Sequence, residues 1–422
     1  AQGWIEMRPS QGTFTSKSLP EIAPRRLVRE EKRNTYPQQT GYPVKPVSHV
    51  HKPAAASRHI NGFHDGPDVR LIPFEELGRA YKSVLTRPAN LKYLSYVDAA
   101  GVQLFRKTLS DYLNGSRGVQ TTYENIMITR GCQMALYLIA RLLFNKGDIV
   151  VVGETNYYYA DHAFINAGAN LQRVPVDDHG IDVDAIEKLC RKKKIKAMYV
   201  TSHHHFPTTV TLTASRRIKL LQLAEQYGFI IIEDDYDYDF HYHSSPILPL
   251  VSADTKGMVI YIGTLSKNIS PAIRTGYIMA PKNLIDELCR LRQIVDTQGD
   301  PVLELMLVEL FRDGVIKRHM KKVLHQYRDR RDFMCSMLQE RLGDVIEFKK
   351  PDGGLAIWAK FDKSIHLPTL SAELRKKEVI LSPGIIHDTG PVSLNSTRMG
   401  FAWMTQNEAA HAIEVLEKTI RK

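Results

Sequence analysis

Short apolar runs alternate with longer segments of helical periodicity through the middle of this chain, and that order constrains the fold more than any other feature. The runs are rich in Val and Ile, and in the segments between them apolar residues recur every three to four positions. The expected strands cover residues 125–129, 149–152, 172–176, 197–201 and 229–233, and the expected helices residues 133–143, 159–167, 183–191 and 214–227. Because this alternation is typical of βαβ units, we expect an α/β fold with a largely parallel sheet.

Helical segments precede and follow the alternating region. One helix is expected to begin near Pro73, and a second, amphipathic helix is expected over residues 101–113. A long helical stretch covers residues 282–342, with breaks at 298–301 and 313–314, where Pro or Gly occurs. The smaller tail that follows has an α+β pattern, which predicts a second, smaller domain.

The first 60 residues carry more than half of the net charge of +11, with ten basic and four acidic side chains. Residues 17–60 are polar and rich in proline, which is typical of a linker. Such a basic linker can follow a phosphate backbone, and a solvated tether is the alternative. Residues 1–16 predict two short strands around a turn. Because so small a hairpin is not stable alone, we expect it to be the tail of a larger module or an edge added to a neighbour.

The spacing of the cysteines and the hydropathy of the chain indicate the cellular compartment of the protein. The four cysteines lie far apart with no Cys-x-x-Cys pair, which fits a reducing cytoplasm and argues against a zinc site or a disulfide framework. No apolar run reaches the ~18 residues that a membrane helix needs, and the first residues show no secretory signal. We therefore expect a cytoplasmic protein without a membrane segment and without a metal site.

One lysine follows a strand in a turn rich in hydroxyl groups. Thr264 and Ser266 precede Lys267, and Arg274 lies seven positions further on. Two hydroxyls and a planar guanidinium are the donors that suit a phosphate dianion. A lysine among phosphate donors is how a Schiff base to pyridoxal phosphate is built. The alternative is an ordinary surface lysine beside a Ser/Thr turn.

Acidic and aromatic side chains follow the apolar strand that ends near Glu233. At the carboxyl end of a parallel strand, such side chains point into the ligand crevice of an α/β sheet. A carboxylate there can hold a pyridinium N–H, and a tyrosine can donate to a phenolate oxygen. A divalent metal cluster is the alternative, but the phosphate-binding glycine loop that usually accompanies it does not occur. Upstream, Gly131, Cys132 and Gln133 form a tight turn into a helix N-terminus, where backbone N–H groups bind phosphate.

Taken together, these motifs resemble the fold-type I aminotransferases that depend on pyridoxal phosphate. The resemblance is strongest to the aminotransferase-like domain of the MocR/GabR regulators in the GntR superfamily. The matching residues are Tyr96-Val97-Asp98 with Gly101, Arg117-Gly118, Gly131-Cys132-Gln133, Glu154 with Tyr158, His204 to Thr208, Glu233 to Asp237, Gly263 to Lys267, Arg274, and Arg398 to Phe401. They run in family order over residues 61–422.

This resemblance implies an organisation for the whole chain. Residues 1–16 would be the remnant of the wing hairpin of a winged helix-turn-helix, whose recognition helices would precede Ala1 and bind DNA. Residues 17–60 would be the basic linker. Residues 61–300 would form the large cofactor-binding domain with its N-terminal arm and a mixed, mostly parallel sheet, and residues 301–422 the small C-terminal α+β domain. The family also implies a homodimer.

The resemblance further implies a role for each site residue. Lys267 would form the internal aldimine with the cofactor, Asp234 would pair with the pyridine nitrogen, and Tyr236 would bond the phenolate oxygen. The other implied roles are ring stacking for Tyr158, phosphate binding for Thr264, Ser266, Arg274 and the turn of Gly131, Cys132 and Gln133, and a carboxylate clamp for Arg398. Tyr96 would reach the partner subunit's phosphate across the dimer.

The chain departs from the family pattern at several positions. Phe206-Pro207-Thr208-Thr209 stands where many aminotransferases have Asn-Pro-Thr-Gly, so the hydrogen bond of the Asn to the cofactor oxygen is lost. Asn156 replaces a proline before the stacking tyrosine, and Cys132 takes a Ser-like place. The histidines at 203–205 are interpreted as a hydrogen-bonded loop. These changes favour cofactor binding with slow transamination.

Two functions are therefore expected from this sequence. The first is the effector-sensing part of a transcription regulator, which binds an amino acid or amine as an external aldimine and biases a DNA-binding module. The second is a competent aminotransferase with Lys267 as general base and Arg398 as substrate anchor. Another pyridoxal phosphate activity on the same fold is a third alternative, because fold does not fix function.

Overall fold

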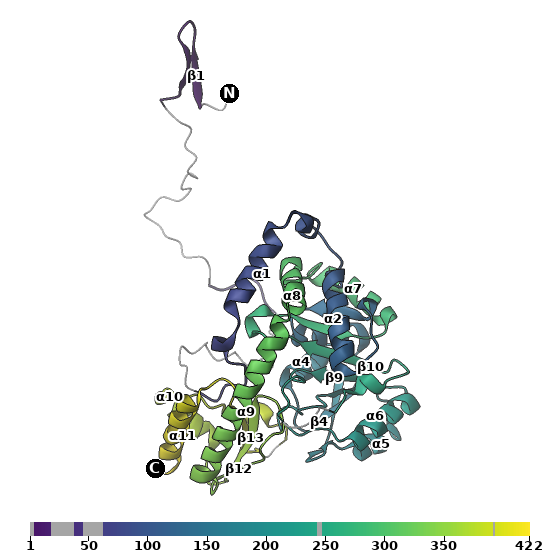
Figure 1. Cartoon of the computed structure of the whole chain (residues 1–422). Coiled ribbons are helices and arrows are strands. Elements are labelled where there is room, and N and C mark those ends of the chain that lie inside the picture. The colour runs from purple at the N-terminus through teal and green to yellow at the C-terminus, as the bar shows by residue number, and fades with distance from the viewer. Residues whose placement is uncertain (1–3, 18–37, 45–61, 243–246, 391–392) are drawn as a thin grey trace. The chain divides into compact units, whose positions relative to one another are not determined.

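The computed structural model describes residues 4–17, 38–44, 62–242, 247–390 and 393–422 (Figure 1). Strands β1 (Ile5–Arg8) and β2 (Gly12–Thr15) form an antiparallel hairpin in a unit separate from the one that holds residues 62–422. The expected hairpin is thus confirmed, and every residue of its two strands is exposed. Most of the expected linker lies outside the described residues.

A seven-stranded sheet in the order β3-β11-β10-β9-β8-β4-β5 organises the larger unit. Its strands are β3 (Ile126–Thr129), β4 (Ile149–Gly153), β5 (Asn170–Val174), β8 (Ala197–Val200), β9 (Ile230–Asp235), β10 (Val259–Thr264) and β11 (Gly276–Met279). All neighbouring pairs are parallel except the two that involve β11, which runs antiparallel to β10 and β3. The mixed, mostly parallel sheet that the sequence predicts is therefore confirmed.

Helices cover both faces of this sheet, so its central strands are apolar on both sides. One face packs on α3 (Cys132–Leu143), α4 (Tyr158–Asn166) and α7 (Lys282–Val295), and the other on α5 (Val183–Cys190) and α6 (Ala214–Tyr227). Strand β9 shows the alternation: Ile232 is buried towards α3, and Ile231 towards α6. These helices begin and end within a few residues of the expected positions.

Further helices pack beside the sheet. Helix α1 (Phe74–Thr86) and helix α2 (Gln103–Arg117) both contact α8 (Pro301–Arg312). The 28-residue helix α9 (Val315–Leu342) follows and leads to the C-terminal part of the chain (Figure 1). None of the helices in the described residues is long and apolar enough to cross a bilayer.

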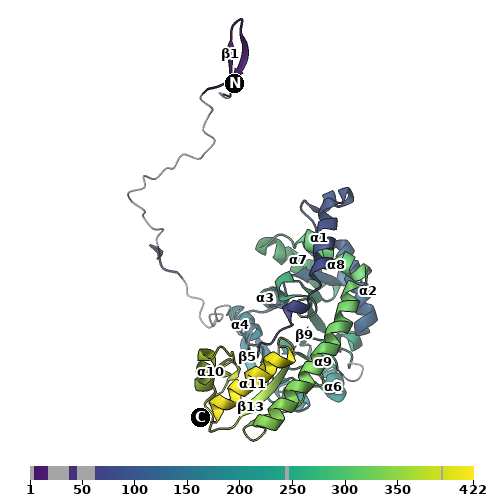
Figure 2. The ribbon, with the colours of Figure 1, turned by 60° about the vertical axis from the view of Figure 1, so that its left-hand side comes forward.

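The C-terminal part is a second layer built on a three-stranded antiparallel sheet. Strand β13 (Ala356–Phe361) lies between β12 (Ile346–Phe348) and β14 (Ser396–Gly400). Helix α10 (Leu367–Lys376) packs on α11 (Gln406–Ile420), which lies along α9 (Figure 2). This arrangement confirms the expected α+β tail. The boundary at residue 301 stays a prediction, since α8 packs with α1 and α2.

The chain from Gly62 to Asp68 lies across the end of the small sheet. The Phe63 N–H donates to the Ile380 carbonyl at 2.9 Å, and the Gly400 N–H donates to the Phe63 carbonyl at 3.2 Å. A Cβ atom at Gly400 would come within 1.8 Å of the His64 carbonyl oxygen, so only glycine permits this approach. The close fit brings residues 64–66 next to the carboxyl ends of the large sheet's strands.

Candidate functional site

A cavity of about 500 Å³ opens where β8, β9 and β10 end, beside the first turn of α3. It is the crevice in which open α/β sheets bind their ligands. Nine of the residues singled out in the sequence line it: Cys132, Gln133, Tyr158, Asp234, Tyr236, Thr264, Ser266, Lys267 and Arg274. The structure therefore brings together residues that lie up to 142 positions apart in the sequence.

Strand alternation divides the acidic side chains at the end of β9. Asp234 faces the cavity, whereas Glu233 and Asp235 point to the opposite face. Glu233 accepts hydrogen bonds from the Leu250 N–H at 2.9 Å and the Val251 N–H at 3.1 Å. Only one carboxylate of β9 is thus available to a ligand in the cavity.

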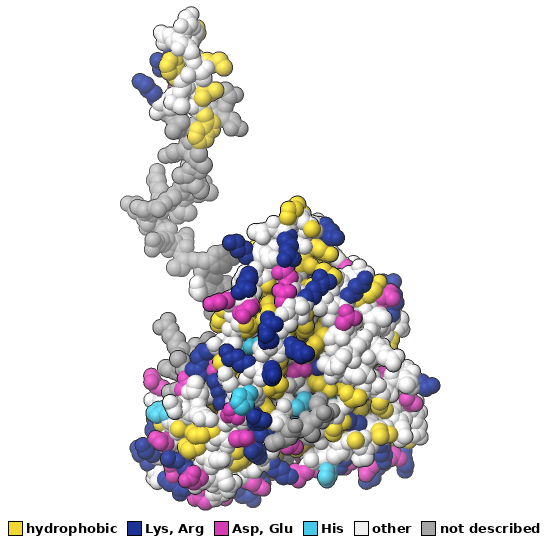
Figure 3. Space-filling view, viewed as in Figure 1, with side chains coloured by type: hydrophobic (Ala, Val, Ile, Leu, Met, Phe, Trp, Pro, Cys, Tyr) yellow, Lys and Arg dark blue, Asp and Glu magenta, His cyan; other side chains and the backbone are white. Residues whose placement is uncertain are grey.

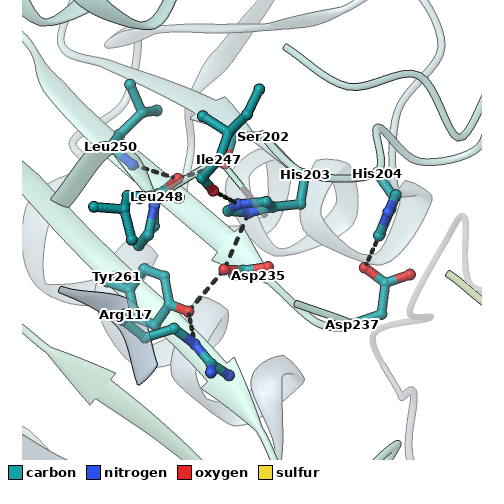
Figure 4. A network of polar contacts seen from close by, with 12 residues as sticks. Arg117, Ser202, His203, His204, Asp235, Asp237, Ile247, Leu248, Leu250 and Tyr261 are labelled. Atoms are coloured by element: carbon teal, nitrogen blue, oxygen red, sulfur yellow. Dashed lines mark hydrogen bonds and ion pairs between the residues drawn. The ribbon is translucent and has the colours of Figure 1, made fainter. Parts of the chain in front are cut away.

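None of the residues labelled in the polar network of Figure 4 lines the cavity. Asp235 accepts a hydrogen bond from the Tyr261 hydroxyl at 2.7 Å, and Arg117 Nε donates to that hydroxyl at 3.3 Å. His203 Nδ1 lies 3.2 Å from Asp235, and His204 Nδ1 lies 2.8 Å from Asp237 Oδ1. Asp235 is therefore held in place by Tyr261 and His203, and Arg117 in turn positions the Tyr261 hydroxyl.

The histidine run is fixed by hydrogen bonds, as the sequence predicts. His205 Nε2 lies 2.9 Å from the Thr155 carbonyl, and His203 Nε2 is bonded to the Ile247 carbonyl. No group of three or more His, Cys, Asp or Glu side chains suited to a metal occurs in the described part of the chain.

Asp234 is a buried carboxylate without a cationic partner among the described residues. Its Oδ2 accepts a hydrogen bond from the Tyr199 hydroxyl at 2.8 Å, and its Oδ1 has no hydrogen-bond partner there. Burial raises the pKa of Asp234 to about 7, and the charges of Asp235 and Asp237 act in the same direction. A pyridinium N–H in the cavity would supply both the missing donor and the missing positive charge, so the site fits this group.

The opposite end of the cavity offers donors for a phosphate. Ser266 Oγ is buried and has no partner among the described residues, while the Ser266 N–H donates to Thr264 Oγ1 at 3.1 Å. Arg274 holds a left-handed backbone (φ 48°), which turns its guanidinium towards the start of α3. A Cβ atom at Gly131 would lie 2.8 Å from Arg274 Nη2, so glycine makes room for the guanidinium. A hydroxyl, a guanidinium and a helix N-terminus form a fitting phosphate cradle.

A row of three tyrosines forms the aromatic wall of the cavity. The Tyr158 ring packs on Tyr159 with centroids 4.0 Å apart. The Tyr157 ring lies edge-on to Phe206 at 5.2 Å, and its hydroxyl accepts from Gln133 Nε2 at 3.4 Å. Burial raises the pKa of Tyr157, as do the nearby Cys132 and Asp234 groups. All three tyrosines line the cavity, among them the predicted Tyr158.

Arg398 does not line the cavity, although it lies close behind it. It is buried on β14, where its Nε donates to Asp65 Oδ2 at 2.7 Å and its Nη1 to the Pro207 carbonyl at 3.0 Å. Its guanidinium also lies over the Phe206 ring, 4.7 Å from the centroid, which is a favourable cation–π arrangement. Asp65 also lines the cavity, and its carbonyl accepts a hydrogen bond from Lys267 Nζ at 2.9 Å. No motif in the sequence pointed to this residue.

The remaining predicted residues lie as follows. Tyr236 lines the cavity and donates its hydroxyl hydrogen to the His204 carbonyl at 3.0 Å. Tyr96, which follows the short helix η2 (Pro88–Tyr93), is 85% exposed and does not reach the cavity of its own chain. Thr209 has a left-handed backbone conformation (φ 64°), which glycine adopts more easily than other residues. This conformation explains why many aminotransferases have glycine at the corresponding position.

Comparisons with known proteins agree with this geometry. The aminotransferase class I and II family matches residues 70–416. The aromatic-amino-acid aminotransferase 1 of Thermococcus litoralis is 31% identical over 84% of this chain and 86% of its own length. The crystal structure of the kynurenine aminotransferase of Pyrococcus horikoshii, in complex with PMP, superposes with a TM-score of 0.79 at 28% identity over 87% of this chain and 91% of its own.

Transcription regulators are also similar to this chain. The HTH-type transcriptional regulator NorG of Staphylococcus aureus is 25% identical over 100% of this chain and 93% of its own length. The probable rhizopine catabolism regulatory protein MocR of Rhizobium meliloti is 26% identical over 91% and 76%. With the family match over most of its length, this chain belongs to the class I and II aminotransferase family, and its cofactor is pyridoxal phosphate.

Proposed function

We propose that this chain is the effector-sensing domain of a MocR-type transcription regulator and that its cavity holds pyridoxal phosphate and an amino acid or amine. When bound, the cofactor supplies an electron sink and an aldehyde that reacts with amines. Lys267 would hold the cofactor, Asp234 would bind its ring nitrogen, and Ser266, Thr264 and Arg274 would hold its phosphate. Arg398 would bind the carboxylate of an amino acid.

The observation that carries the regulator proposal is the similarity to NorG along the whole chain. This similarity takes in the first 60 residues, which lie before the aminotransferase family match. The exposed β1–β2 hairpin and the basic residues that follow support a wing and a linker to a DNA-binding module. A regulator of this kind would act in the cytoplasm, where DNA is accessible.

A working aminotransferase is the second candidate. It is supported by the 31% identity to the Thermococcus enzyme and by the position of Lys267 in the lining of the cavity, where it would act as the general base. Phe206 argues against fast turnover, because a phenyl ring cannot donate or accept the hydrogen bond expected from an asparagine. One buried hydrogen bond to a charged group contributes about 1.5–3 kcal/mol, so losing half of it slows the reaction about three- to tenfold.

Substitution of Asp234 tests its proposed role through pH. The folded-state pKa of Asp234 lies above its unfolded value, so ionisation destabilises the cofactor-free protein increasingly as pH rises from about 4 to about 7. We expect cofactor-free Asp234→Asn to have a higher free energy of unfolding than the cofactor-free wild type, measured by urea denaturation. The difference between the two proteins should grow as the pH rises from about 4 to about 7. We also expect its affinity for pyridoxal phosphate to fall at least about tenfold.

Asp235→Asn is the matched control for this experiment. Asp235 is equally buried, but its ion pair with His203 holds the pKa of its carboxyl at about 2 against the effect of burial. Because the ionised form of Asp235 is favoured in the folded state, Asp235→Asn should lower stability throughout pH 5–8. A stability difference for Asp234→Asn that is constant or shrinks as pH rises would contradict the proposed environment of Asp234.

We further propose that the protein is a homodimer with two-fold symmetry. Apolar side chains come to the surface on α1, on η2 and just after η2, among them Phe74 (64% exposed), Leu91 (66%) and Tyr96 (85%). Figure 3 shows that apolar side chains lie among charged ones on this face of the molecule. A groove lined by Ile72, Leu77 and Tyr81 lies beside them. Exposed apolar side chains together with an apolar groove are typical of an interface, and a second copy would bring Tyr96 towards a partner's cavity.

A charge placed in this surface tests the dimer. We expect the wild type to sediment at twice the mass of one chain, and Leu91→Asp to sediment as a monomer at micromolar concentration, because two buried charges would face each other. Ile218→Asp is the control, since Ile218 is a similarly exposed apolar residue (58%) on α6. A monomeric wild type, or a dimer unaffected by Leu91→Asp, would refute this interface.

The regulator and the enzyme are separated by measuring both activities. The product of the whole gene should bind DNA next to that gene, and an amino acid or an amine should change its affinity for DNA. In steady-state transamination with common donor and acceptor pairs, turnover should remain about three- to tenfold below the ~10 s⁻¹ typical of enzymes. Many turnovers per second, with no effect of the same donor on DNA binding, would overturn the regulator proposal.

A further inference from the structure

The side-chain carboxylate of Asp65 binds Arg398 at the position that the carboxylate of the proposed ligand would occupy. Its Oδ2 accepts from Arg398 Nε at 2.7 Å, and its backbone carbonyl accepts from Lys267 Nζ at 2.9 Å. Asp65 lines the cavity and is one-quarter exposed, whereas Arg398 is almost fully buried behind it. A ligand that enters the cavity therefore meets Asp65 before it meets Arg398.

The segment around Asp65 is fixed at both ends. On one side, Phe63 is bonded to Ile380 and Gly400. On the other, the Asp68 N–H donates to the Tyr327 hydroxyl at 2.9 Å, and the Asp68 carboxylate pairs with Arg330 at 2.9 Å. Displacement of the Asp65 side chain therefore requires only a local change in residues 64–66.

The charges around Asp65 favour its ionised form. Burial alone would raise the pKa of Asp65, but the charges of Arg398, Lys267 and, more weakly, His387 bring it down to about 2. The carboxylate is thus negative at every physiological pH. Because Arg398 is buried and Asp65 is only one-quarter exposed, the two charges attract each other more strongly than they would in water. A ligand carboxylate that binds Arg398 must therefore replace one negative charge with another.

We propose that Asp65 is a specificity-determining residue, because its carboxylate occupies the Arg398 clamp and competes with the carboxylate of any ligand. The proposal rests on the role assigned above to Arg398. Its consequence is a site that discriminates against carboxylate ligands relative to uncharged ligands of the same shape. Only an amino acid with enough further contacts in the cavity displaces Asp65, whereas an amine without a carboxylate has no need to do so.

The size of the effect follows from competition within one molecule. A clamp that is open in one molecule out of ten shows a tenfold weaker apparent affinity than a clamp that is always open. Removal of the Asp65 charge should therefore tighten carboxylate binding at least about tenfold. Binding of an uncharged analogue, which makes no demand on Arg398, should not change.

The experiment compares two probes that do not react with the cofactor. 3-Phenylpropionate and its amide differ only in the carboxylate, and their phenyl group suits a cavity walled by Tyr157, Tyr158 and Phe206. Their affinities for the protein loaded with pyridoxal phosphate are measured by calorimetry for the wild type, Asp65→Asn and the control Glu347→Gln. Glu347 is an exposed carboxylate of β12 (82%), so its variant removes one negative charge without reaching the cavity.

We expect Asp65→Asn to bind 3-phenylpropionate at least about tenfold more tightly than the wild type and Glu347→Gln, with amide affinity equal in all three. If the wild type and Asp65→Asn bind 3-phenylpropionate with equal affinity, the proposed competition by Asp65 is wrong. The same holds if Asp65→Asn binds the amide more tightly by the same factor as the carboxylate. Neither result would contradict the role of Arg398 as a clamp. No binding of the carboxylate to either protein would overturn the competition together with the clamp role of Arg398.

Hydrogen exchange in the wild type gives a second readout that needs no variant. The Gly66 N–H donates to the His64 carbonyl at 3.1 Å, within the short segment that must move when Asp65 leaves Arg398. Saturating 3-phenylpropionate should therefore speed exchange at residues 64–66, and the amide should not. Unchanged exchange with bound carboxylate would contradict the displacement of Asp65.

Discussion

The buried negative charge of Asp234 is the constraint on which the rest of the site depends. Because β9 is the middle strand of the seven, its end is enclosed by helices on both faces, and water cannot stabilise the carboxylate there. The Tyr199 hydroxyl satisfies one of its oxygens and leaves the other open towards the cavity. A protein rarely maintains such a group without a function, and a cationic ring nitrogen is the partner that this cavity accommodates.

The two ends of the cavity are built by different parts of the fold. The large sheet provides the phosphate donors and Asp234, and the small sheet provides Arg398 on β14. Residues 62–68 connect the two, since they bond to both β14 and Lys267. This segment follows the proposed linker in the chain. In the proposed regulator, a ligand carboxylate on Arg398 would thereby act on residues that follow the linker to the DNA-binding module.

The sequence predicted those features that depend on local patterns. Helical periodicity and buried Val/Ile runs located the strands and helices of the alternating region, and the hydroxyl-rich turn located Lys267. The direction of β11 was not predictable, because four buried residues (Gly276–Met279) carry no pattern that distinguishes an antiparallel from a parallel strand. Residues missed in the site depend on tertiary contacts: Asp65 pairs with Arg398 across 333 positions, and Tyr199 is one apolar-flanked residue of a fully buried strand.

The most direct test of the account is chemical trapping of the cofactor. After incubation with pyridoxal phosphate, reduction with sodium borohydride fixes the phosphopyridoxyl group to the lysine that holds it, and peptide mass spectrometry identifies that lysine. We expect the added mass on the peptide that contains Lys267, and none in Lys267→Ala treated in the same way. A wild type labelled at another lysine, or not labelled at all, would contradict the assignment of this cavity as the cofactor site.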